Sequence, residues 1–296
     1  PAVLAYEEIP IPRPAAGEVL VRQTAIGLNF IDVYHRSGLY PAPVPFTPGL
    51  EGAGIVEEVG TGVSLKKGTR VAYCKGPLGA YSEYRVMPAE DLISLPDSID
   101  DQIAAALMLK GLTVHYLLRR TYPVKKGDII LVHAAAGGVG LLMCQWASHL
   151  GATVIGAVSS DAKAAKAKEN GCHHTILSTK ENIAERVVEL TGGAKCHVAY
   201  DSIGKDTFEA SLDSLRPLGM MVSFGQSSGP IPPLDTSILA KKGSLFLTRP
   251  TLFDYVRARA DYESAAKEVF SLVEKGILNI HIGQTFALKD AAKAHE

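Results

Sequence analysis

A glycine-containing turn, residues 134–140, carries the clearest chemical signal in the sequence. Ala134, Gly137 and Gly140 follow one another at three-residue spacing, after the apolar run 129–132 and before a helix-length apolar segment. A strand, a tight turn and a helix in this order bind a dinucleotide pyrophosphate, because the helix begins with N–H groups that face the anion. The spacing AxxGxxG alone is a weak signal, and the flanking strand and helix make it a strong one. The residues expected to hold the pyrophosphate are Ala136, Gly137, Gly138, Val139 and Gly140.

The residues after the second expected strand, 152–158, bear on the choice of dinucleotide. Folds that bind NAD place a carboxylate there for the adenosine ribose, whereas this chain has Ser159 and Ser160, with Lys163 three residues later. Hydroxyl groups and a cation suit a 2′-phosphate, which a carboxylate would repel, so the pattern favours NADPH over NADH. The same residues also fit a helix N-cap followed by a solvated lysine, and a serine can serve both purposes.

Small and polar residues follow the fourth and fifth expected strands as well. Ligands of open parallel sheets bind at the carboxyl ends of the strands, so these residues are expected to line the same crevice as the pyrophosphate. They are Ser202, Gly204, Phe224, Gly225 and Ser227. The alternative is that they only form the turns after the strands.

The elements that position these residues form an α/β pattern. Strand-like segments near 129–133, 153–158, 174–177, 197–201, 220–224 and 244–248 alternate with helical patterns at 140–150, 161–170, 181–190 and 206–215. That rhythm predicts a doubly wound parallel sheet. Two helices, 101–109 and 110–119, are expected before it. A helix at 261–275, a short strand near 277–287 and a helix from Asp290 are expected after it.

Residues 1–108 are rich in strand and turn signals. Strand patterns at 18–22, 54–60 and 69–73 are separated by proline-containing loops, which exclude long helices. This predicts a small, mainly β domain, to which residues 251–296 are expected to return. The dinucleotide-binding domain is then residues 109–250.

Composition and charge exclude several classes of protein. A formal net charge of -1 argues against a nucleic-acid surface. The four cysteines are widely separated, which favours a reducing, cytoplasmic setting over a secreted disulfide framework. The uncharged stretch between Asp128 and Asp161 is interrupted by glycines and histidines, which argues against a membrane span. The chain starts without Met and stops inside a helical pattern, so residues are expected to be missing from both termini.

Five motifs give the chain a resemblance to a known superfamily. They lie at 27–40, 127–140, 200–204, 221–228 and 243–250 and span nearly the whole chain. The chain resembles the medium-chain dehydrogenases/reductases, and within them the zinc-free NADPH:quinone oxidoreductases of the zeta-crystallin-like branch. The resemblance implies a GroES-like substrate domain with a Rossmann domain, NADPH as cofactor and a quinone as substrate. It also implies a homodimer that pairs through the edge strand 243–249.

The sequence departs from the zinc alcohol dehydrogenases of the same superfamily. Those enzymes have a cysteine ligand near the position of Asn29 and a Gly-His-Glu where this chain has Gly49, Leu50 and Glu51. Catalytic zinc needs three Cys, His or carboxylate ligands, and neither Asn29 nor Leu50 can serve. We therefore expect no metal.

The resemblance also implies which residues lie at the nicotinamide. Asn29, Asp32 and Tyr34 would line that end of the cleft, with Tyr40 at its mouth. Asn29 or a tyrosine hydroxyl would stabilise the negative charge that hydride transfer places on a carbonyl oxygen. Asp32 is expected to be a structural cap rather than a proton donor, and the tyrosines also fit core or loop positions. The resemblance adds three further cofactor contacts, Leu252 and Phe253 over the nicotinamide and Ser178 near the adenosine phosphate.

Two other functions fit the same motifs. A related NADPH-dependent reductase of a conjugated double bond, in an enal, enone or enoyl thioester, would need a firmer proton donor for the α-carbon. A non-catalytic NADPH-binding protein, similar to lens crystallins or single-stranded-RNA binders, belongs to a different class. The near-neutral charge and the lack of an arginine and aromatic platform argue against RNA.

Overall fold

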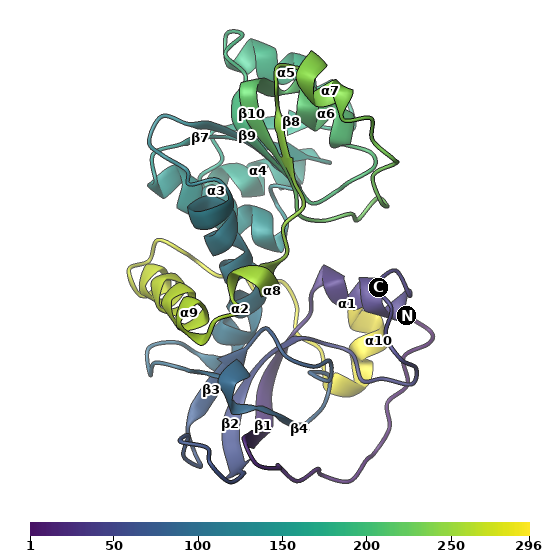
Figure 1. Cartoon of the computed structure of the whole chain (residues 1–296), viewed down its shortest axis with the longest axis vertical. Helices are drawn as coiled ribbons and strands as arrows, with labels where there is room; N and C mark the ends of the chain where they lie inside the picture. Colours follow the sequence, from purple (N-terminus) through teal and green to yellow (C-terminus); the bar gives the residue numbers. More distant parts are fainter. The chain divides into compact units, whose positions relative to one another are not determined.

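A computed structural model describes residues 1–296 and divides them into two compact units. The first comprises Pro1–Leu112, Ala258–Glu274 and Ile280–Glu296, and the second comprises Thr113–Arg257 and Lys275–Asn279. Figure 1 shows the elements of each unit in the colours of the sequence. The two units are described separately below.

The first unit is built on a five-stranded sheet in which every pairing is antiparallel. The strands are β1 (Glu18–Gly27), β2 (Glu51–Val59), β3 (Arg70–Tyr73), β4 (Tyr84–Pro88) and β5 (Ile93–Ser94), in the order β4-β1-β2-β3-β5. Their inward residues form one core, which includes Val19, Val21, Val56, Val71 and Tyr73. A short helix, α1 (Phe30–Arg36), follows β1 directly. The mainly β character predicted for this part of the chain is confirmed.

The two helices expected at 101–109 and 110–119 are in fact one. Helix α2 (Asp101–Tyr116) runs through Gly111 without a break and continues into a π-helical turn, Leu117–Thr121. Gly111 has a packing role instead: a Cβ there would lie 2.8 Å from the Leu107 side chain and 2.9 Å from that of Val269. The glycine therefore permits the close approach of α9 (Arg259–Glu274) rather than ending α2.

The second unit contains the predicted parallel sheet. Its strands are β6 (Ile129–His133), β7 (Thr153–Val158), β8 (His174–Leu177), β9 (Cys196–Asp201), β10 (Leu215–Ser223) and β11 (Phe246–Thr248). All pairings are parallel and the order is β11-β10-β9-β6-β7-β8. The order of strands reverses between β6 and β9, and ligands of such sheets bind at this reversal, beyond the carboxyl ends of the strands.

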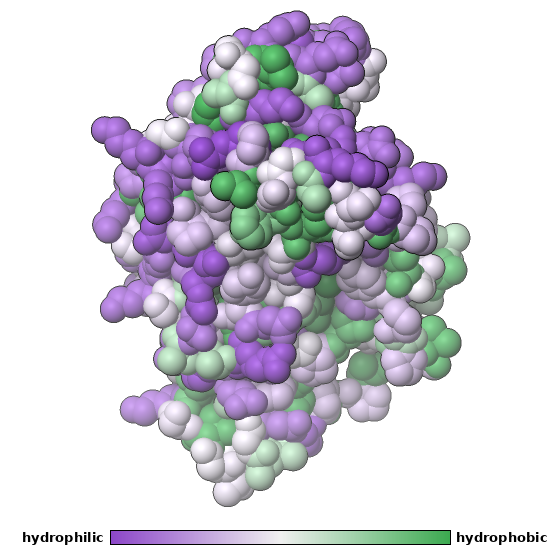
Figure 2. All heavy atoms as spheres, turned by 45° about the horizontal axis from the view of Figure 1, so that its top comes forward, coloured by the Kyte–Doolittle hydropathy of each residue, from purple (hydrophilic) through white to green (hydrophobic).

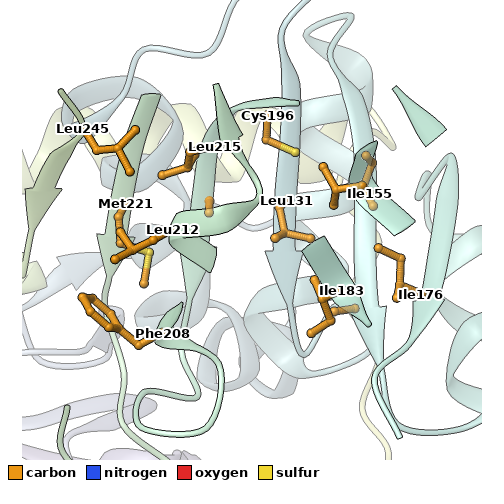
Figure 3. Close-up of a cluster of buried hydrophobic side chains, with 13 residues drawn as sticks. Leu131, Ile155, Ile176, Ile183, Cys196, Phe208, Leu212, Leu215, Met221 and Leu245 are labelled. Carbon is orange, nitrogen blue, oxygen red and sulfur yellow. The ribbon is translucent and has the colours of Figure 1, made fainter. Parts of the chain in front are cut away.

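Helices complete the Rossmann-type arrangement of the second unit. They are α3 (Gly138–His149), α4 (Asp161–Glu169), α5 (Ile183–Leu190), α6 (Phe208–Asp213), α7 (Ser237–Lys241) and α8 (Leu252–Tyr255). Figure 3 shows the core between strands and helices, with Leu131, Ile155 and Met221 from the sheet and Phe208 and Leu212 from α6. The prediction of a doubly wound α/β sheet is confirmed.

The short strand expected near 277–287 does not form. This stretch has no strand partner, and Asn279 N instead donates to the Gln145 side chain at 2.8 Å. The apolar residues there are mostly exposed, apart from Leu278. A strand needs a neighbour for its backbone groups, which local sequence does not reveal. The last helix, α10 (Ala291–Ala294), begins after Asp290 as expected.

The surface shows no extended apolar band on the face drawn in Figure 2, where hydrophobic residues form separate patches among hydrophilic ones. None of the helices combines the length and the apolar character required to cross a membrane. The uncharged stretch 129–160 is divided among β6, α3 and β7, which agrees with the interpretation that it is not a membrane span.

Candidate functional site

The glycine turn after β6 is shaped so that only small residues fit. Ala134 has a positive φ of 50°, and Gly137 is the N-cap of α3. A Cβ on Gly140 would lie 2.3 Å from the Ala134 carbonyl oxygen and 2.7 Å from the Ala135 backbone. No side chain caps α3 and its first turn holds no acidic residue. The start of the helix can therefore offer its backbone N–H groups to an anion, and the pyrophosphate expected there stays a prediction.

A buried polar chain links the ends of the two strands at the reversal point. The Ser211 hydroxyl lies 2.8 Å from His133 Nε2 and donates to Asp201 Oδ2 at 2.9 Å. Since a serine hydroxyl has one hydrogen, His133 must donate from Nε2 to Ser211. Burial lowers the pKa of His133, which keeps the ring neutral. Local sequence does not reveal this role of His133, because Ser211 is 78 residues away along the chain.

Asp201 also organises the loop after β9. Its Oδ1 accepts from the backbone N–H groups of Ile203 at 2.7 Å and Gly204 at 3.0 Å, and its Oδ2 accepts from the Thr207 hydroxyl at 2.8 Å. The carboxylate is completely buried and has no cation partner among its hydrogen bonds, so these donors stabilise its charge. These hydrogen bonds fix the loop that carries Gly204 at the end of β9, the strand next to β6 in the sheet.

The loops after β9 and β10 lie against each other. A Cβ on Gly225 would lie 2.5 Å from the Ser202 carbonyl oxygen, and Ser227 N donates to the same oxygen at 3.3 Å. Phe224 N donates to the Asp201 carbonyl oxygen at 2.8 Å. The structure thus brings together the predicted residues Ser202, Gly204, Phe224, Gly225 and Ser227. It adds one that sequence reasoning missed, Ser223, whose buried Oγ has no hydrogen-bond partner.

The serines after β7 confirm the helix-cap interpretation, while the binding of a 2′-phosphate stays a prediction. Ser160 Oγ caps α4 by accepting from Lys163 N at 3.4 Å, and Lys163 Nζ donates to Ser159 Oγ at 2.9 Å. Ser178, after β8, donates to the Val158 carbonyl oxygen at 3.1 Å. The cation and the hydroxyls are therefore gathered at the carboxyl edge of neighbouring strands.

Of the other predicted residues in this unit, Leu252 is buried and Phe253 is exposed on α8.

In the first unit, Asn29 is held by a buried carboxylate. Asn29 Nδ2 donates to Glu51 Oε2 at 2.6 Å, and Leu109 N donates to Glu51 Oε1 at 2.7 Å. Lys110 Nζ lies 3.5 Å from Oε2 and pairs with the charge. A Cβ on Gly27 would lie 2.3 Å from Oε2, so the glycine makes room for Glu51. One amide N–H of Asn29 is thus committed to Glu51, which fixes the orientation of the other.

Asp32 lies in the first turn of α1, where it caps the helix. Its Oδ2 accepts from Asn29 N at 2.9 Å and from the Tyr81 hydroxyl at 3.1 Å, while Oδ1 is buried without a partner. Burial raises the pKa of Asp32 to about 6, and the charge of Glu51 acts in the same direction. The cap role expected for Asp32 is therefore only part of its chemistry, because this carboxyl exchanges its proton at about pH 6.

Aromatic rings surround the C-terminal half of α1. The ring centres of Tyr34 and Tyr40 are 5.0 Å apart, and those of Phe30 and Tyr34 are 5.2 Å apart. Tyr34 is buried, whereas 55% of Phe30 is exposed. The structure brings the two predicted tyrosines together and adds Phe30, an exposed apolar ring that the sequence did not single out.

A quinone oxidoreductase from Pseudomonas aeruginosa is 55% identical to this chain over 297 residues, which cover 100% of the chain and 91% of that protein. The chain belongs to the quinone oxidoreductase family. A second family relative, a 2-haloacrylate reductase from a Burkholderia species, is 48% identical and covers 98% of the chain and 90% of its own length. The quinone oxidoreductase of Escherichia coli, solved in complex with NADPH, matches with a TM-score of 0.98 at 48% identity, covering 99% of this chain and 91% of that one.

Two family models match separate parts of the chain. The model of the alcohol dehydrogenase GroES-like domain matches residues 15–97, and the model described as zinc-binding dehydrogenase matches residues 138–271. Both place the chain in the medium-chain dehydrogenase/reductase superfamily. The resemblance drawn from the sequence motifs is confirmed.

The zinc in the name of the second family model does not fit the residues of this chain. No group of three or more His, Cys, Asp and Glu side chains could hold a metal ion. Leu50 offers no ligand atom, and the Glu51 carboxylate is already engaged by Asn29, Leu109 N and Lys110. Both oxygens of Glu51 would have to leave these partners to reach a metal.

Proposed function

We propose that this protein is an NADPH-dependent quinone reductase that works without zinc. The observation that carries the proposal is the glycine turn at the strand reversal. There, Gly140 allows the backbone of α3 to approach Ala134, and no acidic group opposes an anion. The family relatives named as quinone oxidoreductases at 48–55% identity support the choice of substrate.

The residues present fit NADPH. The turn 136–140 holds the pyrophosphate, and Lys163 with Ser159 and Ser160 binds the 2′-phosphate. The loops after β9 and β10, and the buried, unpartnered hydroxyl of Ser223, line the nicotinamide end of the crevice. Ser178, Leu252 and Phe253 are the remaining proposed contacts. When bound, NADPH supplies a hydride to the acceptor.

In the first unit, the start of α1 receives the acceptor. Glu51 orients the Asn29 amide so that its second N–H is available for the carbonyl oxygen on which negative charge develops. Tyr34, Tyr40 and Phe30 give a planar, electron-poor quinone an aromatic surface. The domain division proposed for this arrangement is 1–108 with 251–296 for the substrate and 109–250 for NADPH.

The test is NADPH oxidation, followed at its absorbance band, with 1,4-benzoquinone, 9,10-phenanthrenequinone and a short enal in parallel. EDTA is present in each assay, and NADH is the comparison cofactor. Rapid turnover with the quinones and NADPH is the expected result. Tight NADPH binding without oxidation by any acceptor would contradict the proposal and favour a non-catalytic NADPH-binding protein.

A second candidate function is the reduction of a conjugated double bond. Two observations favour it: the 48% identical relative named 2-haloacrylate reductase, and Asp32, a buried carboxyl whose pKa is raised to about 6. Protonation of the α-carbon requires such a donor. Turnover with the enal and not with quinones would favour this function.

We also propose that the protein is a cytoplasmic homodimer that pairs through residues 243–249. Strand β11 is the last strand of its sheet, so its outer edge has unpaired backbone groups, and Phe246 and Leu247 are exposed. Pairing with a second copy would cover this edge. Sedimentation should give a dimer for the native chain and a monomer for Leu247→Lys.

A further inference from the structure

A continuous chain of hydrogen bonds runs from the surface of the first unit to the buried carboxyl of Asp32. Tyr81 OH lies 3.1 Å from Asp32 Oδ2 and 2.9 Å from His295 Nε2. On the other side of the imidazole, Arg36 Nη1 lies 2.8 Å from His295 Nδ1. Arg36 and His295 are half-buried, whereas Asp32 is completely buried. Three separate parts of the sequence therefore contribute to one chain of donors and acceptors.

The hydrogen-bonding capacity of each group fixes the direction of this chain. Arginine can only donate, so His295 Nδ1 must accept and its Nε2 must carry the hydrogen. That hydrogen points to the Tyr81 oxygen, which leaves the Tyr81 hydroxyl hydrogen for Asp32 Oδ2. Every donor in the chain is thus aligned toward Asp32.

The same reasoning locates the proton of Asp32. Oδ2 already accepts from Asn29 N and from Tyr81, so a proton on the carboxyl belongs on Oδ1. Oδ1 is buried and has no partner in the protein. A carboxyl whose only free donor has no protein acceptor can give that proton to a bound molecule, and its Oδ2 can take a replacement from Tyr81.

The charges around the chain agree with this protonation. Burial has the largest effect on the pKa of Asp32 and raises it, and the charge of Glu51 on β2 acts in the same direction. The charge of Lys110 on α2 opposes them, and the net effect is a raised pKa. Burial and the charge of Arg36 lower the pKa of His295, so the imidazole is neutral. Burial raises the pKa of Tyr81, and Asp32 and Glu51 do so as well, so its hydroxyl keeps its hydrogen.

We propose that the His295–Tyr81–Asp32 chain is a proton relay, which takes up protons at its His295 end and delivers them to the substrate from Asp32 Oδ1. The inference rests on the proposed function. Reduction of a quinone to a hydroquinone takes two electrons and two protons, and a hydride brings both electrons with one proton. The relay supplies the other proton: the Asp32 O–H bond breaks, and an O–H bond forms on the hydroquinone oxygen.

Reprotonation then runs along the aligned bonds. Tyr81 gives its hydroxyl proton to Oδ2 and takes the Nε2 proton of His295, and His295 Nδ1 takes one from water when Arg36 moves aside. Rotation of the carboxyl and the tyrosine hydroxyl, together with a turn of the imidazole that exchanges its two nitrogens, restores the starting arrangement. Tyr81 and His295 act through Asp32 and are positioning and relay residues, whereas Asp32, whose Oδ1 is buried, must turn toward the substrate to give up its proton.

The first test needs no turnover. Infrared spectra of the whole chain at about pH 5 should contain a carboxylic C=O band that disappears in Asp32→Asn. On transfer to D₂O this band should shift at least about tenfold more slowly in Tyr81→Phe and His295→Gln than in the native chain. The matched controls are Tyr6→Phe and His281→Gln, which alter an exposed tyrosine and an exposed histidine. The absence of an Asp32 band, or equal exchange rates in all variants, would overturn the relay.

The second test uses quinone reduction. In Tyr81→Phe we expect kcat to fall about tenfold with a larger solvent isotope effect, while the Kd for NADPH is unchanged. Removal of the Tyr81 hydrogen bond also raises the pKa of Asp32, so the alkaline break in the kcat profile should move to higher pH. A lower kcat without either change would indicate a merely structural role and overturn the proposal. If no quinone is reduced but the infrared exchange depends on Tyr81 and His295, the relay stands and the proposed function fails.

Discussion

His133 and Asp201, the last residues of the neighbouring strands β6 and β9, bind the same buried hydroxyl, that of Ser211. These strands flank the reversal of strand order, and the residues after them form the proposed NADPH site. One side chain from α6 therefore sets the relative position of both loops. The cofactor site depends on a residue that lies outside it.

Ser211→Ala tests this dependence. Loss of the hydroxyl leaves His133 without a partner and removes one donor from the Asp201 carboxylate, so we expect the free energy of unfolding to fall by about 2 kcal/mol. The Kd for NADPH should rise as the loops loosen. Urea unfolding and fluorescence titration measure the two effects. Ser214→Ala is the matched control, since this buried serine bonds only to the Ala210 carbonyl oxygen. Equal losses in both variants would argue against a special role for Ser211.

Asp32→Asn should change how stability depends on pH. The pKa of Asp32 rises from 3.8 to about 6 on folding, so the folded chain binds this proton more tightly than the unfolded chain. The stability from Asp32 is therefore present below pH 3.8 and lost as the pH rises through about 6. Relative to Asp32→Asn, the native chain should lose about 2.5 kcal/mol between about pH 4 and about pH 8. Urea unfolding at both pH values gives the difference, and a constant difference would contradict the raised pKa.

Gly140→Ala should damage the pyrophosphate site. The added Cβ would meet the backbone of Ala134 and Ala135, which cannot move without opening the turn. We expect NADPH affinity to fall by at least about tenfold, measured by fluorescence titration. Gly283→Ala is the control, because a Cβ there meets nothing closer than 3.9 Å. Unchanged NADPH binding in Gly140→Ala would place the pyrophosphate elsewhere.

Lys163→Ala should alter the choice between the two dinucleotides. Loss of one charge-assisted contact to the 2′-phosphate should lower kcat/KM for NADPH about tenfold and leave the value for NADH unchanged. Steady-state kinetics with both cofactors measures this. Lys168→Ala, an exposed lysine on the same helix, is the control. An equal decrease for NADPH and NADH would mean that Lys163 does not contact the 2′-phosphate.

Local sequence determined the parts of this protein that depend on neighbouring residues. Alternating apolar strands and helices predict the parallel sheet, because each pattern follows the period of its own element. Ala134, Gly137 and Gly140 predict the turn, because the glycines and the adjoining strand and helix lie within one short segment. Ser159, Ser160 and Lys163 could be placed for the same reason, since they follow β7 directly. The two errors, the break assumed in α2 and the strand at 277–287, both concern contacts with distant segments.

Only the tertiary structure decided how the polar groups are connected. Tyr81 and His295 are 214 residues apart, and His133 and Ser211 are 78 apart, so no spacing in the sequence relates them. The protonation of Asp32 is likewise a tertiary property, because burial beside Glu51 raises its pKa and Tyr81 supplies its partner. Local patterns predict the helices and strands, because backbone hydrogen bonds repeat at fixed spacing along the chain. A buried polar side chain instead finds its partner in whichever distant segment the fold brings near.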